Sequence, residues 1–179
     1  MSTISNALSP IKELLPEEAK DLKLNLGSVI ERNVLSPSET IGVALAASIM
    51  TRNNDLVETF SGIDDLKSED LTGAKIAASL MAMNTTWYPF VELSDDDELG
   101  KFQAGLRMNA FSNHGGTDAV RFEAFCLSAA IVGKCHKCIS SHVKALRDAK
   151  WTTEQIRDVG RIASTIAGVA TTLDTMAVV

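Results

Sequence analysis

Apolar residues recur at spacings of three and four along most of the chain, the pattern of amphipathic helices. Between residues 16 and 32 such a stripe runs through Leu22, Leu26, Val29 and Ile30. Similar patterns predict further helices over 36–53, 68–88, 122–133, 135–150 and 152–176. No segment alternates apolar and polar residues as a half-buried strand would, so the sequence predicts an all-α fold.

Local signals mark where helices start and where they are interrupted. Ser36-Pro37 is a plausible N-cap and first-turn pair, and Pro16 is followed by two glutamates that suit a helix N-terminus. The acidic stretch 91–100 and the glycine-rich stretch 112–118 are expected to be a loop and a turn.

Length and charge limit the classes of function. The 179 residues fit one domain spanning 1–179, and the hydrophobic content of 45% is that of a globular protein. A net charge of −6 disfavours binding to nucleic acid or to an anionic membrane. The longest apolar run, residues 41–50, is half a membrane span, and the N-terminal residues do not resemble a signal peptide. A cytoplasmic protein is expected.

The two halves of the sequence resemble one another. "LAASIMTRN" (45–53) aligns with "LSAAIVGKC" (127–135), and "KIAASLMAMNTT" (75–86) aligns with "RIASTIAGVATT" (161–172). The two offsets are similar, which predicts an internal repeat of about 36–88 and 122–176. In this alignment Asn53 occupies the position of Cys135.

The segment "GKCHKCISSHV" (133–143) concentrates the reactive side chains of the chain. If a helix begins at Cys135, then Cys135, Cys138 and His142 share one face at steps of three and four. A helix N-terminus and an imidazole both favour a thiolate, so His142 could accept the proton of Cys138. Glu123, one helix upstream, could reach the same face and orient the histidine.

Other interpretations of this segment remain open. Cys135, Cys138 and His142, with His136 or Glu123, could bind zinc and stabilise a helical binding module. The dithiol could instead act as a redox sensor or as the reductase of a partner protein, without turnover of a small substrate. Two further residues are expected to have no chemical role. They are Cys126, expected in the core, and His114, expected to be exposed in a turn.

Several blocks make the chain similar to the alkylhydroperoxidase D family of the carboxymuconolactone decarboxylase-like superfamily. They are "AKDLKLNL" (19–26), "MNTTWY" (83–88), "GLRMN" (105–109) and "FEAF" followed by the two cysteines and a histidine. The family signature is a glutamate, eleven residues, Cys-x-His-Cys, three residues and a histidine. Glu123, Cys135, Cys138 and His142 have that spacing.

One position departs from the family signature. Lys137 stands where the signature has histidine, and His136 lies one place earlier. Since consecutive helical residues are about 100° apart, His136 does not simply replace the family histidine. Lysine could supply its positive charge.

The resemblance implies an all-helical homotrimer whose second half carries the active site, with no bound cofactor. It implies an antioxidant peroxidase that reduces organic hydroperoxides and hydrogen peroxide and regenerates a two-cysteine peroxiredoxin. Electrons would come from dihydrolipoamide on a lipoylated dehydrogenase subunit.

The resemblance also implies a role for each site residue. Cys138 would be the peroxidatic thiol that becomes a sulfenic acid. Cys135 would donate a proton and resolve the sulfenic acid as the Cys135–Cys138 disulfide. His142 and Glu123 would form the proton relay.

Overall fold

The computed structural model describes residues 3–176, and within this range the chain forms helices and no strand, which confirms the all-α prediction. The α-helices are α1 (Thr3–Leu14), α2 (Lys20–Glu31), α3 (Pro37–Thr51), α4 (Asn54–Ser61), α5 (Ser68–Leu93), α6 (Asn109–Asn113), α7 (Ala119–Val132), α8 (His136–Asp148) and α9 (Thr153–Met176). Three short 3-10 helices are η1 (Glu17–Ala19), η2 (Leu99–Lys101) and η3 (His114–Gly116).

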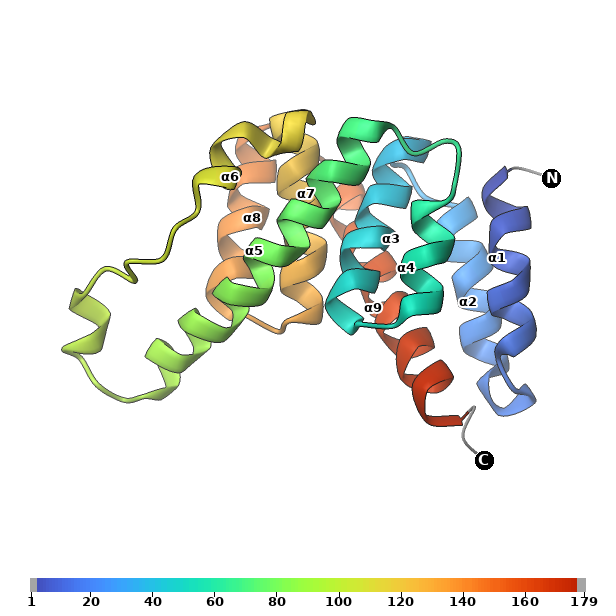
Figure 1. Ribbon diagram of the computed structural model, residues 1–179, viewed down its shortest axis with the longest axis horizontal. Helices are drawn as coiled ribbons and strands as arrows, with labels where there is room; N and C mark the ends of the chain where they lie inside the picture. The colour runs from blue at the N-terminus through green and yellow to red at the C-terminus, as the bar shows by residue number, and fades with distance from the viewer. Residues whose placement is uncertain (1–2, 177–179) are drawn as a thin grey trace.

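Helix α3 lies at the centre of the fold and packs against α4, α5, α7 and α9 (Figure 1). Its residues 41–47 are all fully or almost fully buried, which explains why this apolar run shows no polar face. Gly42 allows the closest approach, because a Cβ atom there would lie 2.4 Å from the ring of Phe125. The phenyl ring of α7 therefore rests directly on the backbone of α3.

Helices α1 and α2 form one end of the molecule, whereas α8 packs on α7 and α5 toward the other end (Figure 1). None of the helices in the described range is long and apolar enough to cross a membrane.

Most predicted helix starts agree with the structure to within a few residues. Ser36 accepts a hydrogen bond from the Glu39 amide, and the Glu39 carboxylate accepts one from the Ser36 amide, which is a capping box. The predicted helix 16–32 is divided into η1 and α2, and α5 continues beyond residue 88, through Pro89, to Leu93.

Three α-helices within residues 3–176 were not predicted from the sequence: α1, α4 and α6, the last of which has only five residues. Helix α1 contains Pro10 and many polar residues, and α4 has only eight residues, so neither shows a long apolar stripe. Helix α1 is nonetheless anchored by Leu8 and Ile11, which are buried against the rest of the protein.

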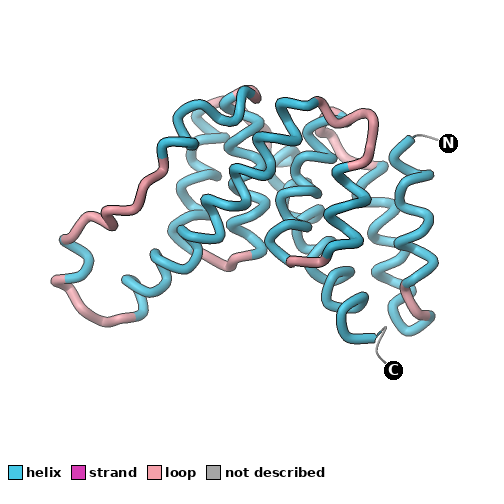
Figure 2. The backbone as a smooth tube through the Cα atoms, in the orientation of Figure 1, coloured by secondary structure: helices cyan, strands magenta, loops and turns pink. Residues whose placement is uncertain are grey.

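The segment between α5 and α6 projects from the body of the protein and contains η2 (Figure 2). The predicted acidic loop at 91–100 is wrong in its first part, because α5 continues to Leu93. Phe90, Leu93, Phe102 and Leu106, at the end of α5 and in this segment, expose their apolar side chains.

The glycine-rich stretch 112–118 contains the end of α6 and all of η3. The expectation that His114 is simply exposed is wrong. Its ring is half-buried and lies 5.2 Å from the Phe122 ring and 6.3 Å from the Phe111 ring, measured between centroids. This histidine is a packing residue at the N-terminal end of α7.

The predicted repeat corresponds to the element order α3–α4–α5 followed by α7–α8–α9. The aligned residues Asn53 and Cys135 cap equivalent helices. The Asn53 side chain accepts a hydrogen bond from the Leu56 amide at the start of α4. The Cys135 side chain accepts one from the Cys138 amide at the start of α8. The internal duplication stays a prediction. A duplication would be expected to produce equivalent N-caps of this kind in the two halves.

A buried carboxylate connects α9 to the segment between α2 and α3. Asp158 is 1% exposed, and its carboxylate accepts hydrogen bonds from the Val34 amide and from the guanidinium groups of Arg157 and Arg161. Burial by itself raises the pKa of Asp158, but the hydrogen bonds from Arg161, Val34 and Arg157 outweigh it and hold the pKa below the ordinary value of 3.8.

We expect Asp158→Asn to lower the free energy of unfolding at neutral pH by about 1–3 kcal/mol, because charged hydrogen bonds are lost. A carboxyl with a lowered folded-state pKa stabilises the fold above its unfolded-state pKa, and this stabilisation disappears as pH falls through the folded-state value. Urea unfolding between pH 7 and pH 2 should therefore show the two proteins converging at the acid end. Asp148→Asn, at an exposed carboxylate paired with Lys144, is the control and should change stability little. A difference that stays constant down to the acid end would contradict the assignment.

Candidate active site

The turn between α7 and α8 places the two cysteines. Lys134 adopts a left-handed conformation with φ of 55°, and Cys135 is the N-cap of α8. Cys138 lies in the first turn of α8, with a Cα–Cα distance of 5.3 Å to Cys135, and the two sulfurs form a disulfide. The Cys138 amide donates a hydrogen bond of 3.2 Å to the Cys135 sulfur. The helix N-terminus therefore points its free amides toward this sulfur pair, a position that favours a thiolate in the reduced protein.

Gly133 sets the distance between this turn and α5. A Cβ atom on Gly133 would lie 2.6 Å from the Thr85 side chain, too close for any other residue unless α5 shifts. The middle of α5 therefore lies directly beside the start of α8.

His142 is positioned by the carboxylate of Glu123. His142 Nδ1 lies 2.6 Å from Glu123 Oε2, and the histidine is 7% exposed. A carboxylate can only accept this hydrogen bond, so Nδ1 carries the proton and Nε2 of the neutral ring is the basic nitrogen. Glu123 comes from α7 and His142 from α8, so the turn at Gly133 brings the relay pair together.

The sulfur of Met81 on α5 lies 3.2 Å from His142 Nε2. A thioether accepts hydrogen bonds only weakly, so Met81 can accept from the imidazolium but does not hold the neutral ring in place. Met81, which belongs to the core, therefore lies against Nε2, the basic nitrogen of His142.

A cavity of about 150 Å³ joins the groups that could react. Its lining comes from α5 and α8 and consists of Asn84, Tyr88, Lys137, Cys138, Ser141 and His142. Cys138 faces this cavity and is 4% exposed, whereas Cys135 is completely buried and is not part of the lining. A small molecule entering the cavity meets Cys138 first.

Lys137, which departs from the family signature, and its neighbour His136 lie in different surroundings. Lys137 Nζ lies 4.8 Å from the centroid of the Tyr88 ring, a cation–π contact at the mouth of the cavity. His136 is exposed, with Nδ1 3.7 Å from the Glu92 carboxylate. Of the two, Lys137 is the one that lines the inner cavity with Cys138.

An outer cavity of about 340 Å³ lies next to the inner one and shares Tyr88 and Lys137 with it. Its remaining lining residues are Val91, Glu92, His136 and Ser140. The two shared side chains thus separate a shallow surface cavity from the cysteine.

Sequence reasoning missed the residues that α5 contributes. Met81, Asn84 and Tyr88 lie three and four residues apart, so one face of α5 is turned toward α8. The block "MNTTWY" contains two of them, but no spacing rule connects it to cysteines fifty residues later in the chain.

Cys126 lies in the core, as predicted, and has no disulfide partner. Burial raises the pKa of the Cys126 thiol well above its ordinary value, and the negative charge of Glu123 raises it further. This thiol is inert at neutral pH, because the thiolate is the reactive form.

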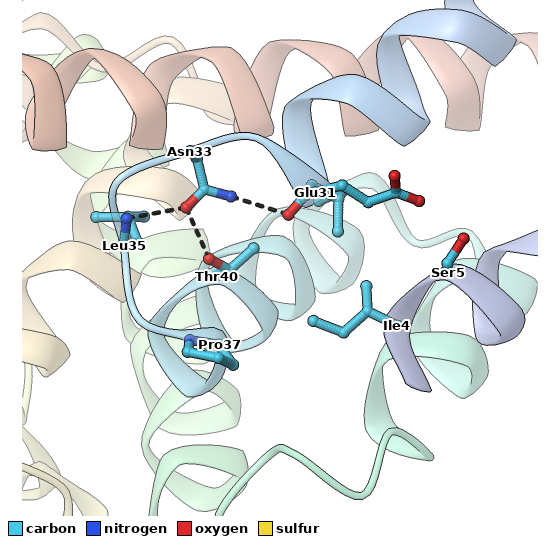
Figure 3. Close-up of a pocket in the computed structure, with 8 residues that line it drawn as sticks. Ile4, Ser5, Glu31, Asn33, Leu35, Pro37 and Thr40 are labelled. Carbon is cyan, nitrogen blue, oxygen red and sulfur yellow. Dashed lines mark hydrogen bonds between the residues drawn. The ribbon is translucent and has the colours of Figure 1, made fainter. Parts of the chain in front are cut away.

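A separate cavity of about 380 Å³ lies between α1 and the connection from α2 to α3 (Figure 3). Asn33 lines it and uses its amide locally, accepting from the Leu35 amide and the Thr40 hydroxyl and donating to the Ile30 carbonyl (Figure 3). Glu31 is its ionisable residue. The hydrogen bonds of Asn33 hold this connection in place.

Within residues 3–176, no group of three or more His, Cys, Asp or Glu side chains is arranged to bind a metal ion.

We expect iodoacetamide to leave Cys126 unmodified in the folded, reduced protein at neutral pH and to label it only after unfolding. Peptide mapping by mass spectrometry would show Cys138 carrying the label in the folded state. Rapid labelling of Cys126 without denaturant would contradict its burial. Cys126→Ser should leave the labelling of Cys138 unchanged.

Comparison with known proteins identifies the family. The carboxymuconolactone decarboxylase family matches residues 97–179, which include the two cysteines, Glu123 and His142. Proteins named alkyl hydroperoxide reductase AhpD are similar over almost the whole chain. That of Frankia alni is 39% identical over 168 residues, covering 93% of this chain and 90% of the relative. That of Mycobacteroides abscessus is 40% identical over 177 residues, covering 95% and 97%. The chain therefore belongs to the AhpD family of alkyl hydroperoxide reductases, within the carboxymuconolactone decarboxylase-like superfamily.

Proposed function

We propose that this protein is an antioxidant peroxidase that reduces organic hydroperoxides and hydrogen peroxide through a Cys135–Cys138 dithiol–disulfide cycle. Membership of the AhpD family makes it a peroxide-reducing oxidoreductase. The observation that carries the proposed cycle is that Cys138 shares a cavity with His142, which is hydrogen-bonded to Glu123, while its sulfur lies within bonding distance of Cys135.

The cycle begins with removal of the Cys138 proton by His142, whose imidazolium is stabilised by the Glu123 carboxylate. The Cys138 thiolate attacks the terminal oxygen of the hydroperoxide, so the S–O bond forms as the O–O bond breaks. Cys138 becomes a sulfenic acid, and the leaving alkoxide takes the proton of the Cys135 thiol to become an alcohol. Two electrons have passed from sulfur to oxygen.

The Cys135 thiolate then attacks the Cys138 sulfur and expels hydroxide, which receives the proton held by His142 and leaves as water. A dithiol reduces the resulting disulfide by thiol–disulfide exchange. In the proposed cycle this dithiol is dihydrolipoamide on a lipoylated dehydrogenase subunit, and a two-cysteine peroxiredoxin is a further acceptor of the electrons. Thiol, acid and base suffice for every step, so the cycle uses no bound cofactor.

Burial supports the order of the two cysteines. As an N-cap, Cys135 would be well placed to be a thiolate, but it is completely buried in the disulfide form and, unlike Cys138, does not line the cavity. Cys138 lines the cavity and lies one turn from His142, so it is assigned as the peroxidatic thiol. Cys135 then suits the role of resolving thiol, because its attack is on a neighbouring sulfur.

Assembly as a homotrimer, which the family resemblance implies, is also part of the proposal, and exposed apolar side chains support a contact between subunits. Phe90, Leu93, Phe102 and Leu106 are exposed on one projecting part of the chain, and Phe90 and Leu106 line a largely apolar cavity of about 360 Å³. Apolar surface of this kind is typical of contacts between subunits.

The cycle predicts a defined mass change. One equivalent of cumene hydroperoxide should remove two free thiols and two hydrogens from the reduced wild-type protein. Cys135→Ser should stop at the sulfenic acid on Cys138, trapped by dimedone, and Cys138→Ser should not react. Intact mass spectrometry and thiol titration measure all three. Cys126→Ser is the matched control and should behave as wild type. Unchanged thiols in the wild type, or bound zinc holding both cysteines, would contradict the cycle and favour a structural zinc site.

The relay predicts a loss of rate in Glu123→Gln. Without the carboxylate the imidazolium is less stable, so fewer Cys138 thiolates form at a given pH and kcat/KM for cumene hydroperoxide should fall by about 10²-fold or more. The rate of Cys138 alkylation increases with pH, because the thiolate is the reactive form. In Glu123→Gln this increase should occur at a higher pH, for the same reason. Glu92→Gln removes an exposed carboxylate near the outer cavity and should leave that profile in place. An unchanged profile in Glu123→Gln would mean that Glu123 holds the fold and does not assist the base.

A further inference from the structure

Asn84 is a buried polar residue of the inner cavity that has no role in the thiol cycle. It lies on α5 between Met81, which contacts His142, and Tyr88, which carries Lys137 above its ring. It is 7% exposed and lines the cavity together with Cys138 and His142. Its carboxamide therefore belongs to the same cavity as the reactive sulfur.

The hydrogen-bonding capacity of this carboxamide is largely unused. Nδ2 lies 3.7 Å from the Met108 sulfur, a weak acceptor, and Oδ1 has no hydrogen-bond partner among residues 3–176. The side chain lines the cavity, so its polar atoms remain available to a molecule that enters it. A polar group with unused hydrogen-bonding capacity inside a reactive cavity indicates a ligand.

We propose that Asn84 is a catalytic residue that binds the hydroperoxide and stabilises its leaving oxygen. This proposal rests on the peroxidase function proposed above. A hydroperoxide has an O–H donor on its terminal oxygen and lone pairs on both oxygens. A carboxamide has the complementary pair of groups, with Oδ1 to accept the O–H and Nδ2 to donate to the oxygen that carries the alkyl group.

The donor acts where negative charge develops. As the Cys138 thiolate attacks the terminal oxygen, the O–O bond breaks and its electron pair moves onto the alkoxide oxygen. The Asn84 N–H group stabilises this charge until the Cys135 proton reaches the alkoxide, which leaves as the alcohol. A preorganised donor in a cavity shielded from water is worth more than the same donor in solvent.

The test uses Asn84→Leu, which keeps the size of the side chain and removes both polar groups. Loss of one such donor should lower kcat/KM for cumene hydroperoxide by about 10²-fold. The melting temperature should stay close to that of the wild type, because the only hydrogen bond lost within residues 3–176 is the weak one to the Met108 sulfur. Asn84→Asp, which keeps the acceptor and loses the donor, should be equally slow with hydroperoxide.

Two thiol reactions that involve no peroxide separate binding of the substrate from positioning of the cysteines. Alkylation of reduced Cys138 by iodoacetamide and reduction of the Cys135–Cys138 disulfide by dihydrolipoamide should both stay within about twofold of wild type in Asn84→Leu. Asn54→Leu, the same change at an exposed asparagine of α4, is the matched control for all three assays.

Hydroperoxide turnover in Asn84→Leu within fivefold of wild type would overturn the proposal. Alkylation and disulfide reduction that fall together with turnover would also overturn it, because Asn84 would then position the thiols. A wild-type protein that exchanges disulfides but consumes no hydroperoxide would remove the peroxidase function itself, and the role of Asn84 with it.

Discussion

Helix α5 lies against the turn between α7 and α8 so closely that only a glycine fits at position 133, where a Cβ atom would meet the Thr85 side chain. This contact fixes where α8 begins, and therefore where Cys135 caps it. It also fixes which residues of α5 face α8. Met81, Asn84 and Tyr88 lie on the turns around Thr85, beside His142, Cys138 and Lys137 respectively. The contact between the backbone of Gly133 and the Thr85 side chain thus determines which residues form the walls of the reactive cavity.

The start of α8 shows how little local structure has to change to create a reactive site. In α4 the N-cap is Asn53, whose side chain accepts from the amide three residues later, and in α8 the N-cap is Cys135, which does the same with its sulfur. Both are buried. A helix N-cap requires an acceptor above the first turn, and a sulfur meets this requirement while adding redox chemistry. The capping position therefore carries a structural role in one half of the chain and a structural and chemical role in the other.

The sequence was sufficient to predict those parts of the site whose residues are related by helical spacing. Cys135, Cys138 and His142 could be placed on one face because they lie within two turns of α8, and Glu123 could be brought near because only one turn separates α7 from α8. The contribution of α5 could not be predicted, since it depends on how two helices cross and no periodicity records that. For the same reason α1 and α4 were missed: their burial depends on partners distant in sequence, and each has only a short apolar face. The half-buried position of His114 against Phe122 is likewise a result of packing, and composition gave no sign of it.

Glu123 acts on two thiols in opposite ways, and His142 accounts for the difference. Toward Cys126 the carboxylate charge acts directly through the core, adding to burial, so the pKa of that thiol rises and the thiol stays protonated. The same charge would also disfavour a thiolate at Cys138 if nothing compensated it. His142 binds the carboxylate through Nδ1 and belongs to the cavity that Cys138 faces, so the proton leaving Cys138 creates an imidazolium beside Glu123. The pair then carries no net charge, and the thiolate is not repelled. One half-buried carboxylate can therefore keep a core thiol inert and assist a reactive one, because only the reactive thiol has a histidine as intermediary.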